Sequence, residues 1–130
     1  MFDNELQYLS ILVFTVSGVK MGIDTEQIIE MLDMQTAQES SANIKKLDEI
    51  IPFGERAVSF IRPKAIRLKA SEMPLIIIED PEDILDVNIA DIKPMPFIIK
   101  MLGSRAVWGA VLTDIGIILL VDFYRLKKTA

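Results

Sequence analysis

A mainly β fold is predicted for this chain, built as a small β-barrel or a pair of barrels with one short helix after the first hairpin. About seven short segments are rich in β-branched, aromatic and other apolar residues, and turn-forming residues separate them. Only one segment carries clear helix-capping signals, and the strand–helix alternation of a doubly wound sheet is missing. With 130 residues, the chain is expected to form one domain over residues 1–130.

An opening hairpin is predicted at the N-terminal end. Residues 8–16 are β-branched and aromatic, and both of their alternating faces are mainly apolar, as in a strand covered on both sides. Residues 17–20 form the expected tight turn, because Gly18 can take the positive φ angle that a hairpin requires. A short second strand is then expected at residues 21–23.

A short helix is predicted after this hairpin, with Asp24 as its N-cap and an end near Asp33 or Met34. Gln27 follows three residues after the cap and is placed as the return half of a capping box. Apolar residues at helical spacing give the segment one stripe: Ile28, Met31 and Leu32.

The middle of the chain combines irregular segments with short strands. Residues 35–54 are expected to be irregular, with some helix. Residues 57–61 and 64–69 are predicted strands, and Pro63 between them marks a bend or a sheet edge because it has no N–H to donate. A further short apolar strand is predicted at residues 75–79.

A closing hairpin is the clearest feature of the last third. The acidic turn at residues 80–83 ends the preceding strand, and residues 86–89 are consistent with another strand. Residues 106–113 and 117–124 are predicted strands, and residues 114–116 join them with a Gly where a bulged turn needs one.

The composition excludes several classes of function. A net charge of −5 argues against a nucleic-acid partner, which draws on clustered Lys and Arg. The absence of His and Cys removes the commonest general base, the commonest metal ligand, disulfides and thiolate metal sites. The longest apolar run, residues 115–121, has about a third of the ~20 residues that cross a bilayer. Asp3 and Glu5 stand where a secretory signal carries basic residues. We therefore expect a cytoplasmic protein with no cofactor, no catalytic centre and no membrane insertion.

The densest charged feature is an acidic cluster around residue 81. Carboxylates at such spacing can hold a hard cation such as calcium, but Pro81 interrupts the run and the central Gly of a calcium loop is missing. A solvated turn with a helix cap is favoured over a metal site. The cluster consists of Glu79, Asp80, Glu82, Asp83 and Asp86.

Asp122 and Trp108 are the remaining single candidates. Asp122 interrupts an apolar strand, and a buried carboxylate of this kind is more often held by a backbone donor or an Arg than used in catalysis. Trp108, beside Gly109, either packs in a core or interface or lines a ligand pocket.

An apolar segment without clean alternation lies at residues 95–103, between Pro and Gly. It either packs inside or leaves Met and Phe side chains exposed as an adaptable docking patch. The candidate partner-binding residues are Met95, Phe97, Ile98, Met101 and Leu102.

Two regions together resemble the CheW-like family, the adaptors of bacterial chemotaxis that link chemoreceptors to the histidine kinase CheA. Residues 12–24, followed by 26–32, look like the first hairpin and short helix of that family. Residues 92–96, 108–112 and 118–123 look like its last linker and hairpin.

The resemblance implies SH3-like β-barrels of the CheW-like type and a non-enzymatic scaffold whose apolar grooves hold partner proteins. The implied partner is a CheA-type histidine kinase or a related signalling protein. Typical members also carry an Asn-Leu-Arg-Gly-like turn that contributes to receptor binding, and residues 35–70 contain no counterpart, so chemoreceptor contact is not carried over. The chain is also short for a two-barrel member, which leaves open that one barrel is trimmed.

Three other interpretations remain open. A small-ligand-binding barrel would need an interior cavity with convergent polar groups, for which Asp122, Tyr124 and Arg105 are candidates. Apolar surface covered by self-association would make the chain a homodimer. An enzyme that uses only Asp, Glu, Lys or Tyr would need two inward carboxylates in a cleft, and no such pair is recognisable.

Overall fold

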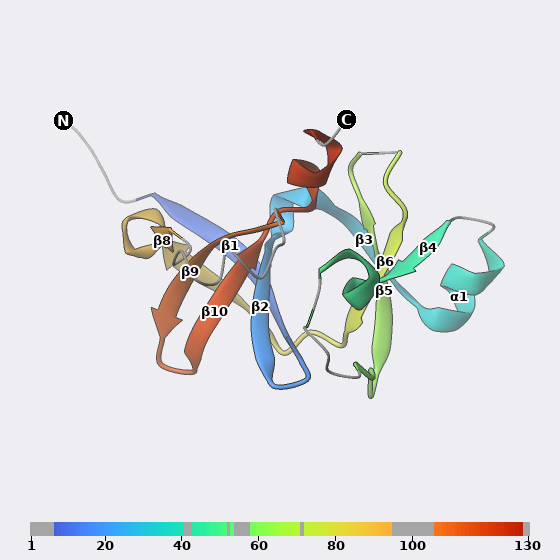
Figure 1. Ribbon diagram of the computed structural model, residues 1–130, viewed down its shortest axis with the longest axis horizontal. Helices are drawn as coiled ribbons and strands as arrows, with labels where there is room; N and C mark the ends of the chain where they lie inside the picture. Colours follow the sequence, from blue (N-terminus) through green and yellow to red (C-terminus); the bar gives the residue numbers. More distant parts are fainter. Residues whose placement is uncertain are drawn as a thin grey trace.

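Two curled sheets lie side by side in the computed structural model, which describes residues 7–40, 43–51, 53, 58–70, 72–94 and 106–128 (Figure 1). The six-stranded sheet has the order β7 (Asp83–Asn88), β1 (Tyr8–Val16), β2 (Val19–Asp24), β10 (Gly116–Val121), β9 (Val107–Thr113) and β8 (Lys93–Pro94). The four-stranded sheet has the order β3 (Ile28–Asp33), β5 (Pro63–Leu68), β6 (Leu75–Glu79) and β4 (Ile44–Lys46). The predicted mainly β class is confirmed.

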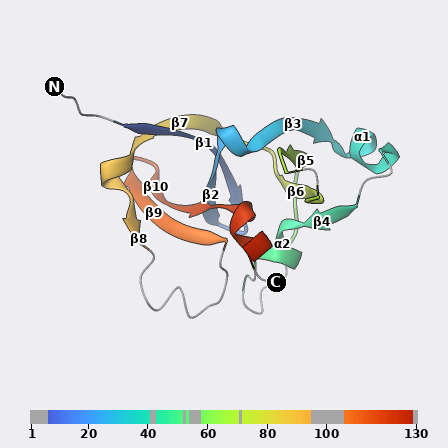
Figure 2. The same ribbon diagram turned by 90° about the horizontal axis from the view of Figure 1, so that it is seen from above.

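Short helical segments connect the strands. Seen from above, the chain passes from the six-stranded to the four-stranded sheet through η1, which joins β2 to β3 (Figure 2). The α-helices of the described residues are α1 (Met34–Glu39) and α2 (Leu47–Ile50). The 3-10 turns are η1 (Thr25–Gln27), η2 (Ile89–Asp91) and η3 (Phe123–Lys128).

The opening hairpin forms as predicted. β1 covers residues 8–16, and its register places Val16 opposite Val19, so that a two-residue turn joins the strands. The φ angles of Ser17 and Gly18 are 51° and 82°, and two positive φ angles in succession define the turn whose twist matches paired strands. β2 continues to Asp24, one residue beyond the expected end.

The helix predicted to start at Asp24 is limited to the single turn η1. The Asp24 side chain does cap it, since Oδ1 accepts from the Glu26 N–H at 2.9 Å. Gln27 does not complete a capping box, because its Nε2 donates to Asp122 instead, at 3.0 Å. The chain therefore leaves helical geometry at Ile28.

The residues expected to continue this helix form β3. Ile28 lies opposite Leu68 in the β3–β5 pairing, so β5 supplies the backbone partners that a helix would have found within itself. Met31 is exposed, whereas Ile28 and Leu32 pack against different clusters, so the apparent helical stripe is not one buried face. The six-residue α1 begins later, where the Asp33 side chain accepts from the Thr36 N–H at 2.8 Å. This bond is the main reason that the pKa of Asp33 lies below its usual range.

The prediction of a strand at residues 57–61 is wrong over the described part of that range. Residues 58–61 have no regular structure. The carboxylate of Glu79 accepts from the backbone N–H groups of Ile61 at 2.9 Å and Arg62 at 2.6 Å. A side chain thus takes the place of a neighbouring strand. Pro63 is the first residue of β5, where its missing donor is tolerated.

The later strands follow the prediction closely. β6 has the expected bounds, and β7 begins three residues before the expected position. The closing hairpin forms, but its turn contains only Asp114 and Ile115, and Gly116, with a φ of 118°, already belongs to β10. β10 ends at Val121, and the predicted continuation to residue 124 is wrong because η3 begins at residue 123.

The main core lies between the two sheets. Alternate residues of β1 face opposite sides: Leu12, Phe14 and Val16 join the shared core, whereas Ile11 and Val13 fill the curled six-stranded sheet. The shared core also contains residues of β2, β10, β5, β6, α2 and the C-terminal turn. Its buried members are Leu12, Phe14, Val16, Met21, Ile23, Leu47, Ile51, Ile66, Leu68, Ile76, Ile78, Ala106, Val121 and Phe123.

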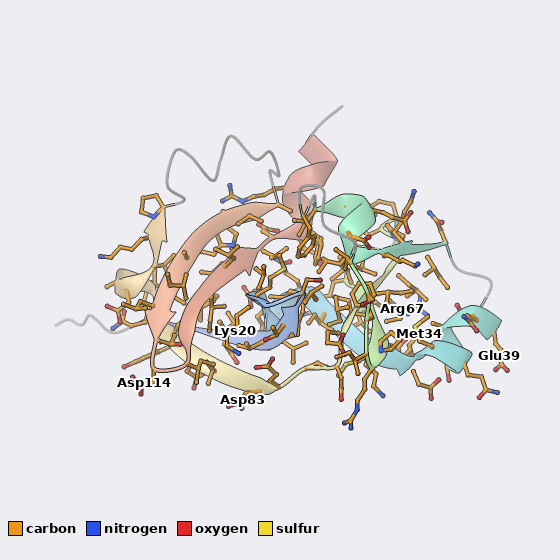
Figure 3. All side chains as sticks on the ribbon, turned by 60° about the horizontal axis from the view of Figure 1, so that its bottom comes forward. Lys20, Met34, Glu39, Arg67, Asp83 and Asp114 are labelled. Atoms are coloured by element: carbon orange, nitrogen blue, oxygen red, sulfur yellow. The ribbon has the colours of Figure 1, made fainter. Side chains whose placement is uncertain are left out.

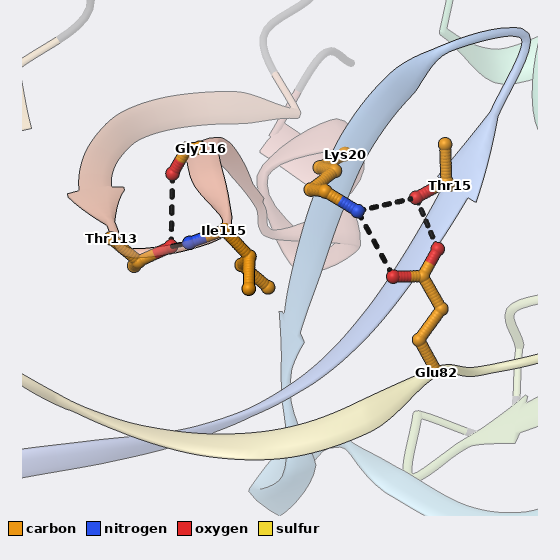
Figure 4. Close-up of polar contacts among 6 residues, drawn as sticks. All are labelled: Thr15, Lys20, Glu82, Thr113, Ile115 and Gly116. Carbon is orange, nitrogen blue, oxygen red and sulfur yellow. Dashed lines mark hydrogen bonds and ion pairs between the residues drawn. The ribbon is translucent and has the colours of Figure 1, made fainter.

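A polar contact fixes the opening hairpin to the segment before β7. The Glu82 carboxylate accepts from the Thr15 hydroxyl and from Lys20 Nζ at 3.1 Å, and Lys20 also donates to Thr15 Oγ1 at 3.3 Å (Figure 4). The hydrogen bond from Thr15 and the charge of Lys20 hold the pKa of Glu82 below its usual range, against the opposing effect of burial.

Replacing Glu82 with Gln should therefore lower stability in a pH-dependent manner. Because the folded-state pKa is lowered, the carboxylate stabilises the fold above its unfolded pKa, and this contribution is lost as pH falls through the folded pKa. The Glu82 side chain is 41% exposed, so we expect at most about 1 kcal/mol at pH 7. Urea unfolding of both proteins from pH 7 to pH 3 measures this; an unchanged difference across the range would contradict it. Glu26→Gln, which alters a more exposed pair with Lys69, is the control.

Candidate binding cleft and apolar surface

A cleft of about 300 Å³ opens at one end of the six-stranded sheet. Several segments meet there, from the start of β1 to the corner that follows β10. The lining residues are Leu9, Asp24, Gln27, Ile89, Ile92, Trp108, Asp122 and Arg125. We call the apolar and aromatic members of this lining its aromatic wall, and the members that carry two carboxylates, an amide and a guanidinium its polar wall.

The polar wall is assembled by the pairing of β2 with β10. These strands run parallel, with Val121 opposite Ile23, so the corners after both strands lie together. Asp122 Oδ1 then accepts from Gln27 Nε2 and from the Tyr124 N–H, each at 3.0 Å. The Tyr124 hydroxyl donates to the Gln27 backbone carbonyl at 3.3 Å. Two of these hydrogen bonds, both made by Gln27, thus join the two corners, and the third lies within the corner after β10.

Arg125 connects the polar wall with the aromatic one. Its Nε lies 3.6 Å from Asp122 Oδ2, and its guanidinium lies 5.7 Å from the centroid of the Trp108 ring. A cation at this distance from an aromatic face is attracted by the ring quadrupole. The structural role predicted for Asp122 is confirmed, because both a backbone donor and an Arg hold it.

Gln27 holds Asp122 with a fixed amide orientation. Its nitrogen must face Asp122, because a carboxylate can only accept, so Oε1 points the other way. Oε1 is buried and has no hydrogen-bond partner in the described structure. An unpaired buried acceptor costs about 1–3 kcal/mol, so Gln27 is held here at some expense in stability.

A second candidate feature is an exposed apolar pair on the β9–β10 hairpin. Leu112 and Ile117 lie directly opposite each other and are 76% and 61% exposed. Thr113 supports the turn beyond them, since its hydroxyl donates to the Gly116 carbonyl at 2.9 Å and accepts from the Ile115 N–H at 3.2 Å (Figure 4). We call Leu112 and Ile117 the hairpin pair.

Over the described residues, the edge of the sheet beside the hairpin pair is only partly paired. β8 has two residues there and pairs with β9 at Gly109 and Ala110. Exposed apolar side chains beside an incompletely paired strand are typical of a surface that other proteins contact. Asp114 is the one charged residue of the turn and lies at its tip (Figure 3).

The acidic cluster is a set of loop contacts. Glu79 and Glu82 bind backbone and side-chain donors as described above, and Asp83 accepts from the Ile84 N–H at 2.8 Å. The prediction that this cluster caps a helix is wrong, because the cluster leads into β7 and not into a helix. Among the described residues, no group of three or more acidic side chains is arranged to hold a metal ion.

Some of the site residues predicted from the sequence lie in the cleft, and others lie outside the described residues. Met95, Phe97, Ile98, Met101 and Leu102 lie outside the described residues, as does Arg105. Trp108 and Asp122 both line the cleft, and Tyr124 binds Asp122 through its N–H.

Sequence reasoning missed Gln27 and Arg125 as cleft residues and the hairpin pair as a surface. The hairpin pair has a readable signal: two large apolar residues close to a predicted turn, one on each side of it, on strands whose next residues inward are also apolar. Arg125 follows Asp122 by three residues, which is the spacing of a local ion pair. No local signal links Gln27 to Asp122.

Comparison with known proteins identifies the fold and no closer relationship. No protein-family model and no curated protein matches the sequence. Among solved structures, the crystal structure of the scaffolding protein TtCheW from Thermoanaerobacter tengcongensis superposes with a TM-score of 0.67 at 15% identity. The match covers 90% of this chain and 90% of that chain, so the chain has a CheW-like fold. Both sheets are present, and the suggestion that one barrel is trimmed is wrong.

Among the described residues, no helix has the length and hydropathy of a membrane-spanning helix.

Proposed function

We propose that the chain is a non-enzymatic signalling adaptor of the CheW type, with residues 1–130 acting as one domain in the cytoplasm. The observation that carries this proposal is the match to a scaffolding protein over 90% of both chains. The partner we propose is a CheA-type histidine kinase or a related signalling protein. Contact with a chemoreceptor is not part of the proposal.

The hairpin pair supplies a contact surface for such a partner. Both side chains lose much of their water contact if a partner covers them, and burial of each is worth about 1.5–3 kcal/mol. The neighbouring turn carries a single charge, Asp114 at its tip, so docking on the hairpin pair requires little desolvation of charged groups. Met95, Phe97, Ile98, Met101 and Leu102 stay proposed as further partner contacts.

The alternative of a ligand-binding barrel has less support. The inside of the six-stranded sheet is filled by side chains, including Ile11, Val13 and Ile118, each fully buried. A ligand would have to bind at the end of the sheet, in the cleft, and not within the barrel.

A titration with the regulatory domain of a CheA-type kinase from the same source tests the adaptor function. We expect saturable binding by calorimetry, and we expect Ile117→Asp to weaken it at least tenfold because the charge must be desolvated at the contact. Ile84→Asp is the matched control, since Ile84 is similarly exposed but lies on β7, at the other end of the strand order.

The outcomes separate the parts of this proposal. Absence of binding by the native chain would overturn the kinase as partner. Equal weakening by both variants would overturn the hairpin pair as the contact surface while leaving the adaptor function supported.

A further inference from the structure

The cleft has a charge imbalance that the adaptor function does not explain. Asp122 is matched by Gln27, the Tyr124 N–H and Arg125. Asp24 receives only the Glu26 N–H, at 2.9 Å, and has no ion-pair partner among the described residues. With two carboxylates and one guanidinium in its lining, the cleft carries a net charge of about −1 near neutral pH.

The other lining residues have a complementary chemistry. Leu9, Ile89 and Ile92 line the same cleft as Trp108, and we call them its aliphatic wall. Such a wall suits a hydrocarbon stem, whereas Asp24 suits a cationic end. The volume of about 300 Å³ lies at the lower limit for ligand pockets, which favours one side chain over a larger molecule.

We propose that the cleft binds a lysine side chain carried by an extended segment of a partner protein. The four-carbon stem packs on the aliphatic wall, and the ammonium group pairs with Asp24. Lysine fits better than arginine because Arg125 already lies over the Trp108 ring, where a second guanidinium would compete for the same aromatic face. An acidic side chain is disfavoured by Asp24 and by the net charge of −5 on the chain.

Trp108 makes the proposal directly measurable. It is the one tryptophan of the sequence and it lines the cleft, so its fluorescence reports on whatever enters. The probe is a blocked pentapeptide, acetyl-Ala-Ala-Lys-Ala-Ala-amide, titrated into the intact chain. The comparison peptide has norleucine at the central position, which keeps the hydrocarbon stem and removes the ammonium group. Pentylammonium alone distinguishes a free amine from a peptide-borne lysine.

Asp24→Asn is the decisive variant. Asparagine keeps a side-chain oxygen for the Glu26 N–H, so η1 is preserved while the charge is removed. Asp114→Asn removes the same charge at the tip of the β9–β10 hairpin and serves as the control (Figure 3). Both variants are first checked for unchanged far-UV circular dichroism.

We expect a saturable fluorescence change with the lysine peptide, and at least tenfold weaker binding for the norleucine peptide and for Asp24→Asn, but not for Asp114→Asn. Equal affinities for the two peptides, or equal effects of the two variants, would overturn the proposal. Tighter binding of pentylammonium than of the peptide would overturn a partner segment as the source. This result is independent of the kinase titration, which can succeed or fail on the hairpin pair alone.

Discussion

Phe14→Ala should lower the free energy of unfolding by about 3–5 kcal/mol, a large share of the roughly 5–15 kcal/mol that stabilises a typical domain. Phe14 is 0% exposed and belongs to the core shared by the two sheets. Truncation removes the apolar contacts of the ring and leaves a cavity that the surrounding strands cannot close, because paired strands on both sides hold its walls.

The position of Phe14 also determines how the variant unfolds. Because its cluster contains residues of both sheets, the loss should destabilise them together and not one sheet alone. Urea unfolding followed by circular dichroism and by Trp108 fluorescence should give one transition at a lower urea concentration by both probes.

Ile117→Ala serves as the matched control for this experiment. It removes apolar volume from the same sheet at an exposed site and should change stability by no more than about 0.5 kcal/mol. A loss for Phe14→Ala below about 1.5 kcal/mol, or two separate transitions, would contradict the shared core as the main source of stability.

Strands with strong local signals are those that the sequence analysis placed well. β1 and β6 are rich in β-branched, aromatic and other apolar residues, and both have the predicted bounds. Residues 17–18 carry the turn chemistry that a hairpin needs, and the hairpin forms there. In these segments local preference and tertiary pairing agree, which is the condition under which a sequence pattern is reliable.

The errors lie where tertiary contacts override a local pattern. The apolar residues of 28–33 have a helical spacing, and the pairing with β5 makes the segment a strand in spite of it. Residues 58–61 have strand-forming composition, but they pair with no strand, and the N–H groups at the end of the segment bind the Glu79 carboxylate instead. A short stretch of sequence around either segment contains neither β5 nor Glu79, so the local pattern alone cannot reveal these contacts.

The candidate site was predictable only in part for the same reason. Asp122 stands out as an acid in an apolar strand, and its structural role follows from general experience with buried carboxylates. Its partner Gln27 is 95 residues away in the sequence, and only the parallel pairing of β2 with β10 brings them together. That pairing is a property of the topology, which strand patterns do not specify.

Gly22→Ala should destabilise the chain by about 1–3 kcal/mol, although alanine normally suits a strand better than glycine. A Cβ atom at this position would lie 2.8 Å from Ile11 Cδ1 and 3.2 Å from Ile118 Cγ2. Both isoleucines are fully buried inside the six-stranded sheet, so neither can move aside without displacing other core residues. Urea unfolding of the variant against the native chain measures the loss.

A double-mutant cycle distinguishes this clash from a backbone effect of the glycine. Ile11→Val removes the Cδ1 atom that makes the closest contact, and alone should cost about 0.5–1.5 kcal/mol. In that background Gly22→Ala should cost at least about 0.5 kcal/mol less than in the native chain, because the new methyl group occupies the space that Cδ1 vacated. Ile84→Val, on the exposed surface of β7, shares no contact with Gly22 and should give additive losses. Additivity in the Ile11 cycle as well would show that glycine is required at this position for its backbone and not for the close approach of the Ile11 and Ile118 side chains.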